Sequence, residues 1–196
     1  MSLVKRIAAH HFVDENRVAV GVGSDELVGE LTRIRGDVAV VPNPHDVTGM
    51  PLAPHRVRQL CEGARRRDAV VVFDERLAEF ALGPNFTSAR WWARFCRNVC
   101  VLRTIPSARI GYVIGDPDVI AQLRPAELPI EAADLLEDLG QRGRWRAENR
   151  VARARLCRRL DELGIRYVPS ATDFVLAHLP TGARRISVGQ ADEVLR

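Results

Sequence analysis

Amine chemistry in this chain depends on a single residue. Of the 29 lysine and arginine residues, Lys5 is the one lysine. A lysine whose pKa is lowered by burial can act as a nucleophile or form a Schiff base near neutral pH. Arginine keeps its charge and binds anions as a planar fork. We therefore expect anion binding through arginine, and lysine-dependent chemistry only if Lys5 takes part.

The cysteines and histidines do not follow the spacing of a metal site. Cys96 and Cys100 fit one helix face, but a zinc site needs two more ligands nearby, and the sequence offers none at suitable spacing. The histidines at positions 10, 11, 45, 55 and 178 are scattered along the chain. The sequence predicts reduced packing cysteines and no metal centre.

A glycine and a serine before a helical pattern form a candidate anion site. Gly23 and Ser24 follow the apolar stretch 18–21, and Leu27 to Ile34 continue as a helix. Backbone N–H groups and the positive end of the helix dipole at such a start suit a phosphate. Ser24 followed by acidic residues is also typical of an ordinary N-cap. The residues alone leave both interpretations open.

Short apolar runs alternate with amphipathic stretches, which is typical of an α/β protein. The patterns predict strands at 18–21, 37–41, 69–73, 99–102 and 110–114. They predict helices at 24–34, 54–66 and 117–123, helical structure from 131 to 163, and short strands around 166, 174 and 186. The apolar stretch 69–73 is typical of a buried parallel strand. The proline-flanked segment 124–129 predicts a boundary between domains 1–124 and 125–196.

Composition excludes several function classes. The chain has 196 residues, of which 46% are hydrophobic, so it can form a buried core. No apolar run approaches the ~20 residues of a membrane span, and the start has no signal-peptide pattern. The net charge is +4, but most arginines between 142 and 159 lie off the apolar stripe of a helix. This pattern favours a solvated face over a nucleic-acid footprint. We expect a cytoplasmic protein that binds neither membranes nor nucleic acids.

Six short motifs occur in an order that resembles a known enzyme family. They are Gly23-Ser-Asp-Glu26, Asn43 to Gly49, Asp74-Glu75, Leu102-Arg-Thr104, Arg109-Ile-Gly-Tyr112, and Pro169-Ser170 through Phe174. Together they resemble class I/II pyridoxal-phosphate (PLP) aminotransferases, with histidinol-phosphate aminotransferases as the nearest subgroup. The resemblance implies a reduced fold-type I architecture: a three-layer, doubly wound, mostly parallel sheet with a small C-terminal α+β part. It also implies PLP as the cofactor.

The resemblance further implies roles for individual residues at matching positions. Ser24, Asp25, Ser107 and Arg109 match positions that hold the cofactor, the phosphate above all, and Asp46 stands where the family has a cofactor-contacting Asn. Asp74 matches the acid beside the pyridine nitrogen, where an ionised carboxylate keeps the ring protonated. Arg185, at the start of Arg185-Ile-Ser-Val-Gly189, matches the arginine that binds the substrate carboxylate.

The departures from the family concern its central chemistry. Only Ile105-Pro-Ser-Ala108 separates Thr104 from Arg109, so the Schiff-base lysine and its loop are missing. Lys5 is remote in the family's layout. Asp46 places an acid where an amide normally donates, and Leu77 replaces a tyrosine. We expect no covalent PLP and no catalytic residue in the lysine's place. If the chain is active, the resemblance makes it an aminotransferase.

Three functions remain open. The first is a degenerate aminotransferase-like protein without transaminase activity that retains PLP or phosphate binding. The second is a non-catalytic partner or regulatory subunit of a full-length aminotransferase. The third is a PLP-independent enzyme acting on a phosphorylated small molecule. Because the family inserts elements between Ile34 and Val41, their absence exposes sheet edges. We expect a re-closed sheet and a homodimer, or a heteromer with a longer paralogue, with an amino acid or phosphorylated compound as ligand.

Overall fold

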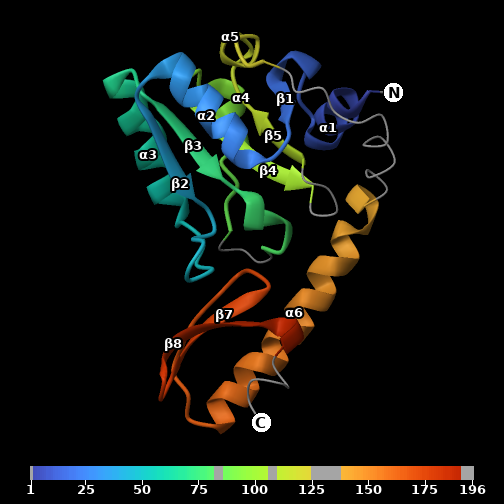
Figure 1. Ribbon diagram of the computed structural model, residues 1–196, viewed down its shortest axis with the longest axis vertical. Coiled ribbons are helices and arrows are strands. Elements are labelled where there is room, and N and C mark those ends of the chain that lie inside the picture. The colour runs from blue at the N-terminus through green and yellow to red at the C-terminus, as the bar shows by residue number, and fades with distance from the viewer. Residues whose placement is uncertain (1, 82–85, 106–109, 125–137, 191–196) are drawn as a thin grey trace.

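The computed structural model describes residues 2–81, 86–105, 110–124 and 138–190. A first sheet has five strands in the order β1-β5-β4-β3-β2 (Figure 1). Its strands are β1 (Val18–Gly21), β2 (Val38–Pro42), β3 (Val70–Asp74), β4 (Val99–Ile105) and β5 (Ile110–Ile114). The helices around it are α1 (Leu3–His11), α2 (Ser24–Arg35), α3 (Pro54–Arg67), α4 (Arg90–Phe95) and α5 (Pro117–Ile120), with the 3-10 turns η1 (Glu15–Arg17) and η2 (Arg76–Glu79).

The first sheet is mixed and mostly parallel. β2, β3 and β4 pair in parallel, whereas β5 pairs antiparallel with both β4 and β1. β1 therefore has the same direction as β4. In the β2–β3 register Pro42 lies opposite Asp74, so both strands end at the same edge. This edge holds the carboxyl ends of parallel strands, where α/β sheets bind ligands.

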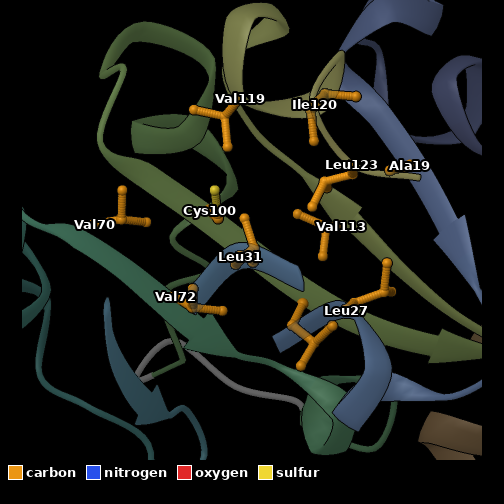
Figure 2. Close-up of a cluster of buried hydrophobic side chains, with 11 residues drawn as sticks. Ala19, Leu27, Leu31, Val70, Val72, Cys100, Val113, Val119, Ile120 and Leu123 are labelled. Carbon is orange, nitrogen blue, oxygen red and sulfur yellow. The ribbon is translucent and has the colours of Figure 1, made fainter. Parts of the chain in front are cut away.

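Alternating side chains divide the core between the two faces of this sheet. On one face Leu27 and Leu31 of α2 pack with Val119 of α5 over Val72 and Cys100 of the strands (Figure 2). These side chains are at most 2% exposed. The neighbouring strand residues point the other way, as the period of two in a strand requires.

The opposite face carries the remaining helices. Val57 of α3 and Ala93 of α4 pack against Phe73 and Val101, while Ile7 of α1 packs with Tyr112 and the rest of a cluster over β1 and β5. Helices thus cover both faces of the sheet, which confirms the expected three-layer architecture. The sequence patterns did not predict α4, a short helix with two tryptophans.

The start of α2 corrects one expectation. The N-cap interpretation of Ser24 is wrong, because Gly23 is the N-cap and Ser24 is the first helical residue, whose Oγ accepts from the Arg76 Nη1. Gly111 of β5 lets this turn approach the sheet, because a Cβ there would lie 2.7 Å from the Gly23 carbonyl oxygen. The missing side chain at Gly111 therefore sets the position of the α2 start.

The C-terminal part consists of a long helix and a second sheet. α6 (Asp138–Glu162) packs on an antiparallel sheet of β6 (Tyr167–Val168), β7 (Phe174–Leu179) and β8 (Gly182–Ser187), and η4 (Val188–Gln190) follows (Figure 1). Leu156 and Leu160 of α6 meet Val175, Ala177 and Ile186 in its core. The proposed boundary at residue 124 adjoins 125–137, outside the described residues, and stays a prediction.

Two general features complete the description. None of the described helices combines the length and the apolar character that a membrane span requires. All four cysteines are free thiols, and Cys61 and Cys100 are buried.

Candidate ligand pocket at the strand ends

A pocket of about 370 Å³ lies at the carboxyl ends of β2 and β3. Three kinds of segment line it: the strand ends and the loop after β2, the η2 turn, and strand β8 of the second sheet. The lining residues are Pro42, Pro44, Asp46, Asp74, Arg76, Leu77, Phe80, Thr104 and Arg185. The two sheets therefore face each other across one pocket that has charged groups on both sides and apolar groups between them.

The carboxylate of Asp74 is occupied by Arg76. The Arg76 Nε donates to both carboxylate oxygens at 2.9 Å, and its Nη2 donates to Oδ2 at 2.6 Å. The Arg76 backbone N–H adds a fourth contact, to Oδ1 at 3.1 Å. A carboxylate offers about four lone-pair sites in total. Because the two Nε contacts share one proton, three N–H groups of Arg76 use most of the acceptor capacity of Asp74.

Arg76 also connects Asp74 to the start of α2. Its Nη1 donates to the Ser24 Oγ at 2.9 Å and lies 3.8 Å from the carboxylate of Asp25. The bonded carboxylate of Asp74, and then the charges of Asp74, Asp25 and Asp46, raise the pKa of Arg76 against the opposing effect of burial. Three carboxylates thus surround one guanidinium, and the group carries excess negative charge.

The loop that carries Asp46 is held from both ends. The amide of Asn43 donates to the Thr87 carbonyl at 3.0 Å and accepts from the Leu52 N–H at 3.0 Å. At the other end the Ala171 N–H donates to the Gly49 carbonyl at 2.9 Å. Asp46 itself is exposed and lies 3.4 Å from the His45 ring. The backbone of the loop therefore fixes the position of Asp46 at the pocket rim.

Arg185 reaches the pocket from β8. Its guanidinium carbon lies 3.7 Å from the ring centroid of Phe174, a cation–π contact that orients the side chain. Among the described residues Arg185 forms no ion pair with a carboxylate. Stacking leaves the edges of a guanidinium available, so Arg185 can receive an anion such as a carboxylate in a two-bond geometry.

Helix α6 connects the second sheet to the carboxyl-end edge of the first sheet through hydrogen bonds. Asn149 donates to the carbonyl oxygens of Phe80 and Thr172 at 3.3 and 3.1 Å. Arg153 donates to the same Thr172 carbonyl at 2.6 Å, and Arg146 donates to the Glu79 carbonyl at 2.9 Å. These bonds tie η2 to the chain just before β7, and so set the distance across the pocket.

Comparison with known proteins assigns the chain to a family. The family model for class I and II aminotransferases matches residues 25–194. The chain belongs to the class I and II aminotransferase family. It is 32% identical over 183 residues to an aromatic amino acid aminotransferase of Mycobacteroides abscessus, covering 86% of this chain and 50% of that protein. It is 30% identical over 186 residues to a histidinol-phosphate aminotransferase of Granulibacter bethesdensis, covering 88% and 49%.

Solved structures show the same fold. A crystal structure from Erwinia carotovora atroseptica matches with a TM-score of 0.85 at 17% identity, covering 98% of this chain and 83% of that one. The histidinol-phosphate aminotransferase of Sinorhizobium meliloti, solved in complex with pyridoxal-5'-phosphate, matches with a TM-score of 0.74 at 18% identity, covering 91% and 66%. The chain spans about half the length of the curated aminotransferases that it matches.

The structure brings some of the residues expected from the aminotransferase motifs together. Asp46, Asp74 and Arg185 line the pocket, and Ser24 and Asp25 lie near it through Arg76. Ser107 and Arg109 lie outside the described residues. The assigned roles of all these residues stay predictions.

Sequence reasoning missed Arg76, which contacts Asp74, Ser24 and Asp25. Its position directly after Asp74-Glu75 was the signal that could have revealed it. An arginine two residues after a strand-end acid can fold back onto that acid.

Proposed function

We propose that this aminotransferase-family chain binds a free α-amino acid in the strand-end pocket without transferring its amino group. The observation that carries the proposal is the occupation of Asp74 by Arg76, together with an Arg185 that has no carboxylate partner among the described residues. The first argues against the family's cofactor chemistry. The second supports recognition of a carboxylate.

The residues present do not fit the pyridine ring of PLP in the way the family uses it. An acid that pairs with the ring nitrogen needs a free acceptor, and three N–H groups of Arg76 already bond to the Asp74 carboxylate and neutralise its charge. The sequence also has no lysine between Arg103 and Ile110, where the family's Schiff-base amine would stand. Without that amine, the chain has no group there to move the proton of the substrate α-carbon.

The charges of the pocket suit an amino acid zwitterion. Arg185 would bind the ligand carboxylate, while Asp46 on the opposite side would face the ammonium group. The excess negative charge around Arg76 favours a cation there and disfavours a phosphate dianion. Leu77 and Phe80 provide apolar surface for the ligand side chain. These features support an apolar or aromatic amino acid over a phosphorylated compound.

Calorimetric titration with L-phenylalanine tests this proposal. We expect binding that is weakened at least about tenfold by Arg185→Gln, because a charge-assisted bidentate contact is lost. Phenylpropionate, which lacks the ammonium group, and phenethylamine, which lacks the carboxylate, should both bind more weakly. Arg184→Gln changes the net charge equally at the neighbouring β8 position and should leave affinity unchanged. Equal affinities for the wild type and Arg185→Gln would overturn the proposal.

Spectroscopy tests the absence of the cofactor chemistry. Addition of PLP to the purified protein should not produce the absorbance shift that accompanies imine formation. If a shift does appear, Lys5→Ala should abolish it, since Lys5 is the one lysine of the chain. Transamination assays with histidinol phosphate and aromatic amino acids should show no turnover. Measurable turnover would overturn this part of the proposal. If PLP gives no shift but inorganic phosphate raises the melting temperature, the phosphorylated-ligand function is favoured instead.

A role as a non-catalytic subunit is a second candidate, and a sheet edge supports it. Among the strands that the structure describes, β2 pairs with β3 alone, and its residues are exposed or half-buried, Val40 among them. An exposed edge strand is a template for pairing with another chain. Light scattering after size-exclusion chromatography should then show a dimer, or the protein should co-purify with a longer aminotransferase. A monomer that captures no aminotransferase would remove this candidate.

A further inference from the structure

A second cavity, of about 240 Å³, lies away from the strand-end pocket, between the end of α1 and α4. Its chemically distinctive lining residues are His11, Phe12, Ser88, Arg90, Trp91 and Arg94. None of the described residues that line it carries a carboxylate. The cavity thus combines cations, a hydroxyl group and aromatic rings, and the function proposed above uses none of them.

The two arginines of this cavity have no anionic partner among the described residues. Arg90 donates through Nη1 to the His11 Nδ1 at 3.1 Å, and the guanidinium of Arg94 lies over the Phe95 ring. Burial, and then the nearby charge of Arg103, lower the pKa of Arg90 despite an opposing effect of Glu75. Glu75 is already paired with Arg103 at 2.6 Å. The positive charge at the cavity is therefore not compensated locally.

The hydrogen bonds of His11 show how this side chain orients Arg90 at the cavity. Its Nδ1 must accept a hydrogen bond, because arginine can only donate. Its Nε2, 2.9 Å from the Tyr112 hydroxyl, then carries the proton of a neutral ring. Protonation of His11 would place a second cation against Arg90. His11 therefore orients Arg90 and leaves the remaining guanidinium N–H groups for other acceptors.

The rim of the cavity exposes two large aromatic side chains. Phe12 is 76% exposed and Trp91 is 66% exposed. The ring of Trp91 is supported by Phe95, with centroids 4.8 Å apart. Phe12 occupies the left-handed C-cap position of α1 at φ 56°, where glycine is favoured. Exposed aromatics beside unpaired cations are typical of a surface that a ligand covers.

We propose that this cavity binds a small aromatic anion: a single ring that carries a carboxylate or phosphate group. The anionic group bonds to Arg90 and Arg94, and the ring packs against Phe12 and Trp91. The cavity is smaller than the ~300–1,000 Å³ of sites for drug-sized ligands, which limits the ligand to about one ring and one anionic group. The site is independent of the strand-end pocket.

Titration calorimetry and tryptophan fluorescence test the proposal, with phenyl phosphate and phenylacetate as probes. Both probes should bind and alter tryptophan emission, and their relative affinity identifies the preferred anionic group. Benzyl alcohol, which has no charge, and inorganic phosphate, which has no ring, should each bind at least about tenfold more weakly. Binding should weaken at high salt, since exposed charges are screened.

Substitutions locate the site. Arg94→Gln should reduce affinity for the better probe at least about tenfold, because one charge-assisted contact is lost. Arg94 is exposed and its removal should leave the melting temperature unchanged, whereas Arg90→Gln provides a second test at a half-buried position. Arg97→Gln removes the same charge from a neighbouring residue that lines another cleft, and Arg185→Gln alters the strand-end pocket; neither should change affinity. Unchanged affinity in folded Arg94→Gln, or equal affinity for benzyl alcohol, would overturn the proposal.

Discussion

Asp74 and Glu75 are consecutive acids at the end of β3, yet they lie in contrasting surroundings. Asp74 faces the strand-end pocket and pairs with Arg76, whose side chain is 42% exposed. The side chain of Glu75 is 0% exposed and pairs with Arg103 at 2.6 Å. Glu75 also accepts from the Ser88 hydroxyl and the Ala89 N–H. One acid borders the pocket, while the other belongs to the interior.

The buried pair is part of a larger network. Arg103 also contacts Glu79 at 3.1 Å, and Glu79 meets Arg146 of α6 at 3.5 Å. Burial alone would lower the pKa of Arg103, but the charges of Glu75, Tyr112 and Glu79 together outweigh it and raise that pKa. A charge in a medium of low dielectric constant must be paired, whereas solvent screens the pair at Asp74. The contrast predicts unequal costs for removing the two acids.

Glu75→Gln should have the largest effect on stability. It leaves the Arg103 charge buried with one partner fewer, which typically costs about 3–5 kcal/mol. Urea unfolding followed by circular dichroism measures this loss. Glu30→Gln breaks the exposed pair with Arg33 and serves as the control, with an unchanged midpoint. The buried network is not essential to the fold if Glu75→Gln unfolds at the control's midpoint.

Gly49→Ala should come next, because it disturbs the loop that carries Asp46. Gly49 has φ 71°, and a Cβ there would clash with the side chain of Ser170 and lie 2.7 Å from the Thr172 Oγ1. We expect a loss of about 2 kcal/mol from the clash and the left-handed backbone, with weaker L-phenylalanine binding. Gly63→Ala is the matched control, since nothing lies within 4 Å of a Cβ there and α3 should gain stability. Equal stability of the two variants would contradict the packing of this loop against the second sheet.

The sequence predicted the helices and strands better than it predicted the different surroundings of Asp74 and Glu75. The apolar run 69–73 and its neighbours identified the strands of the first sheet, because a period of two and buried runs are local signals. The direction of β5 was not predicted, since antiparallel pairing with β1 and β4 depends on residues far apart in the chain. The resemblance pointed to Asp74, which lines the pocket, while its role stays a prediction. The resemblance did not indicate that Arg76 would bond to the Asp74 carboxylate, because this pairing depends on side-chain geometry.

Asp74→Asn tests the half of the comparison that borders the pocket, where the Asp74 side chain is 11% exposed and that of its partner Arg76 is 42% exposed. The substitution removes a charge-assisted pair that is partly solvated, so we expect a loss of about 1 kcal/mol, well below that of Glu75→Gln. It also reduces the negative charge of the pocket, so the affinity for L-phenylalanine should fall a few-fold. Urea unfolding and calorimetry measure the two effects. A stability loss equal to that of Glu75→Gln would show that burial does not separate the two acids.

The smallest expected effect concerns a buried thiol on β4, on the opposite face of the sheet from Arg103. Cys100 of β4 is completely buried, and burial raises the pKa of its thiol from about 9 to about 12. Below pH 8 the thiol is protonated in both folded and unfolded chains, so it adds no pH dependence. As pH rises through 9, only the unfolded chain loses this proton, and stability falls until the folded thiol ionises near pH 12.

This contribution can be isolated by comparing slopes. Cys100→Ala removes the titrating group, so its stability should decline less steeply between pH 7 and 9 than that of the wild type. The expected difference at pH 9 is about 0.5 kcal/mol, from ionisation of the unfolded thiol alone. Comparison of slopes cancels the constant cost of the small cavity left by the substitution. Parallel curves would mean that the buried surroundings of Cys100 accommodate a thiolate, so that burial beside β4 would not by itself require a charge to be paired.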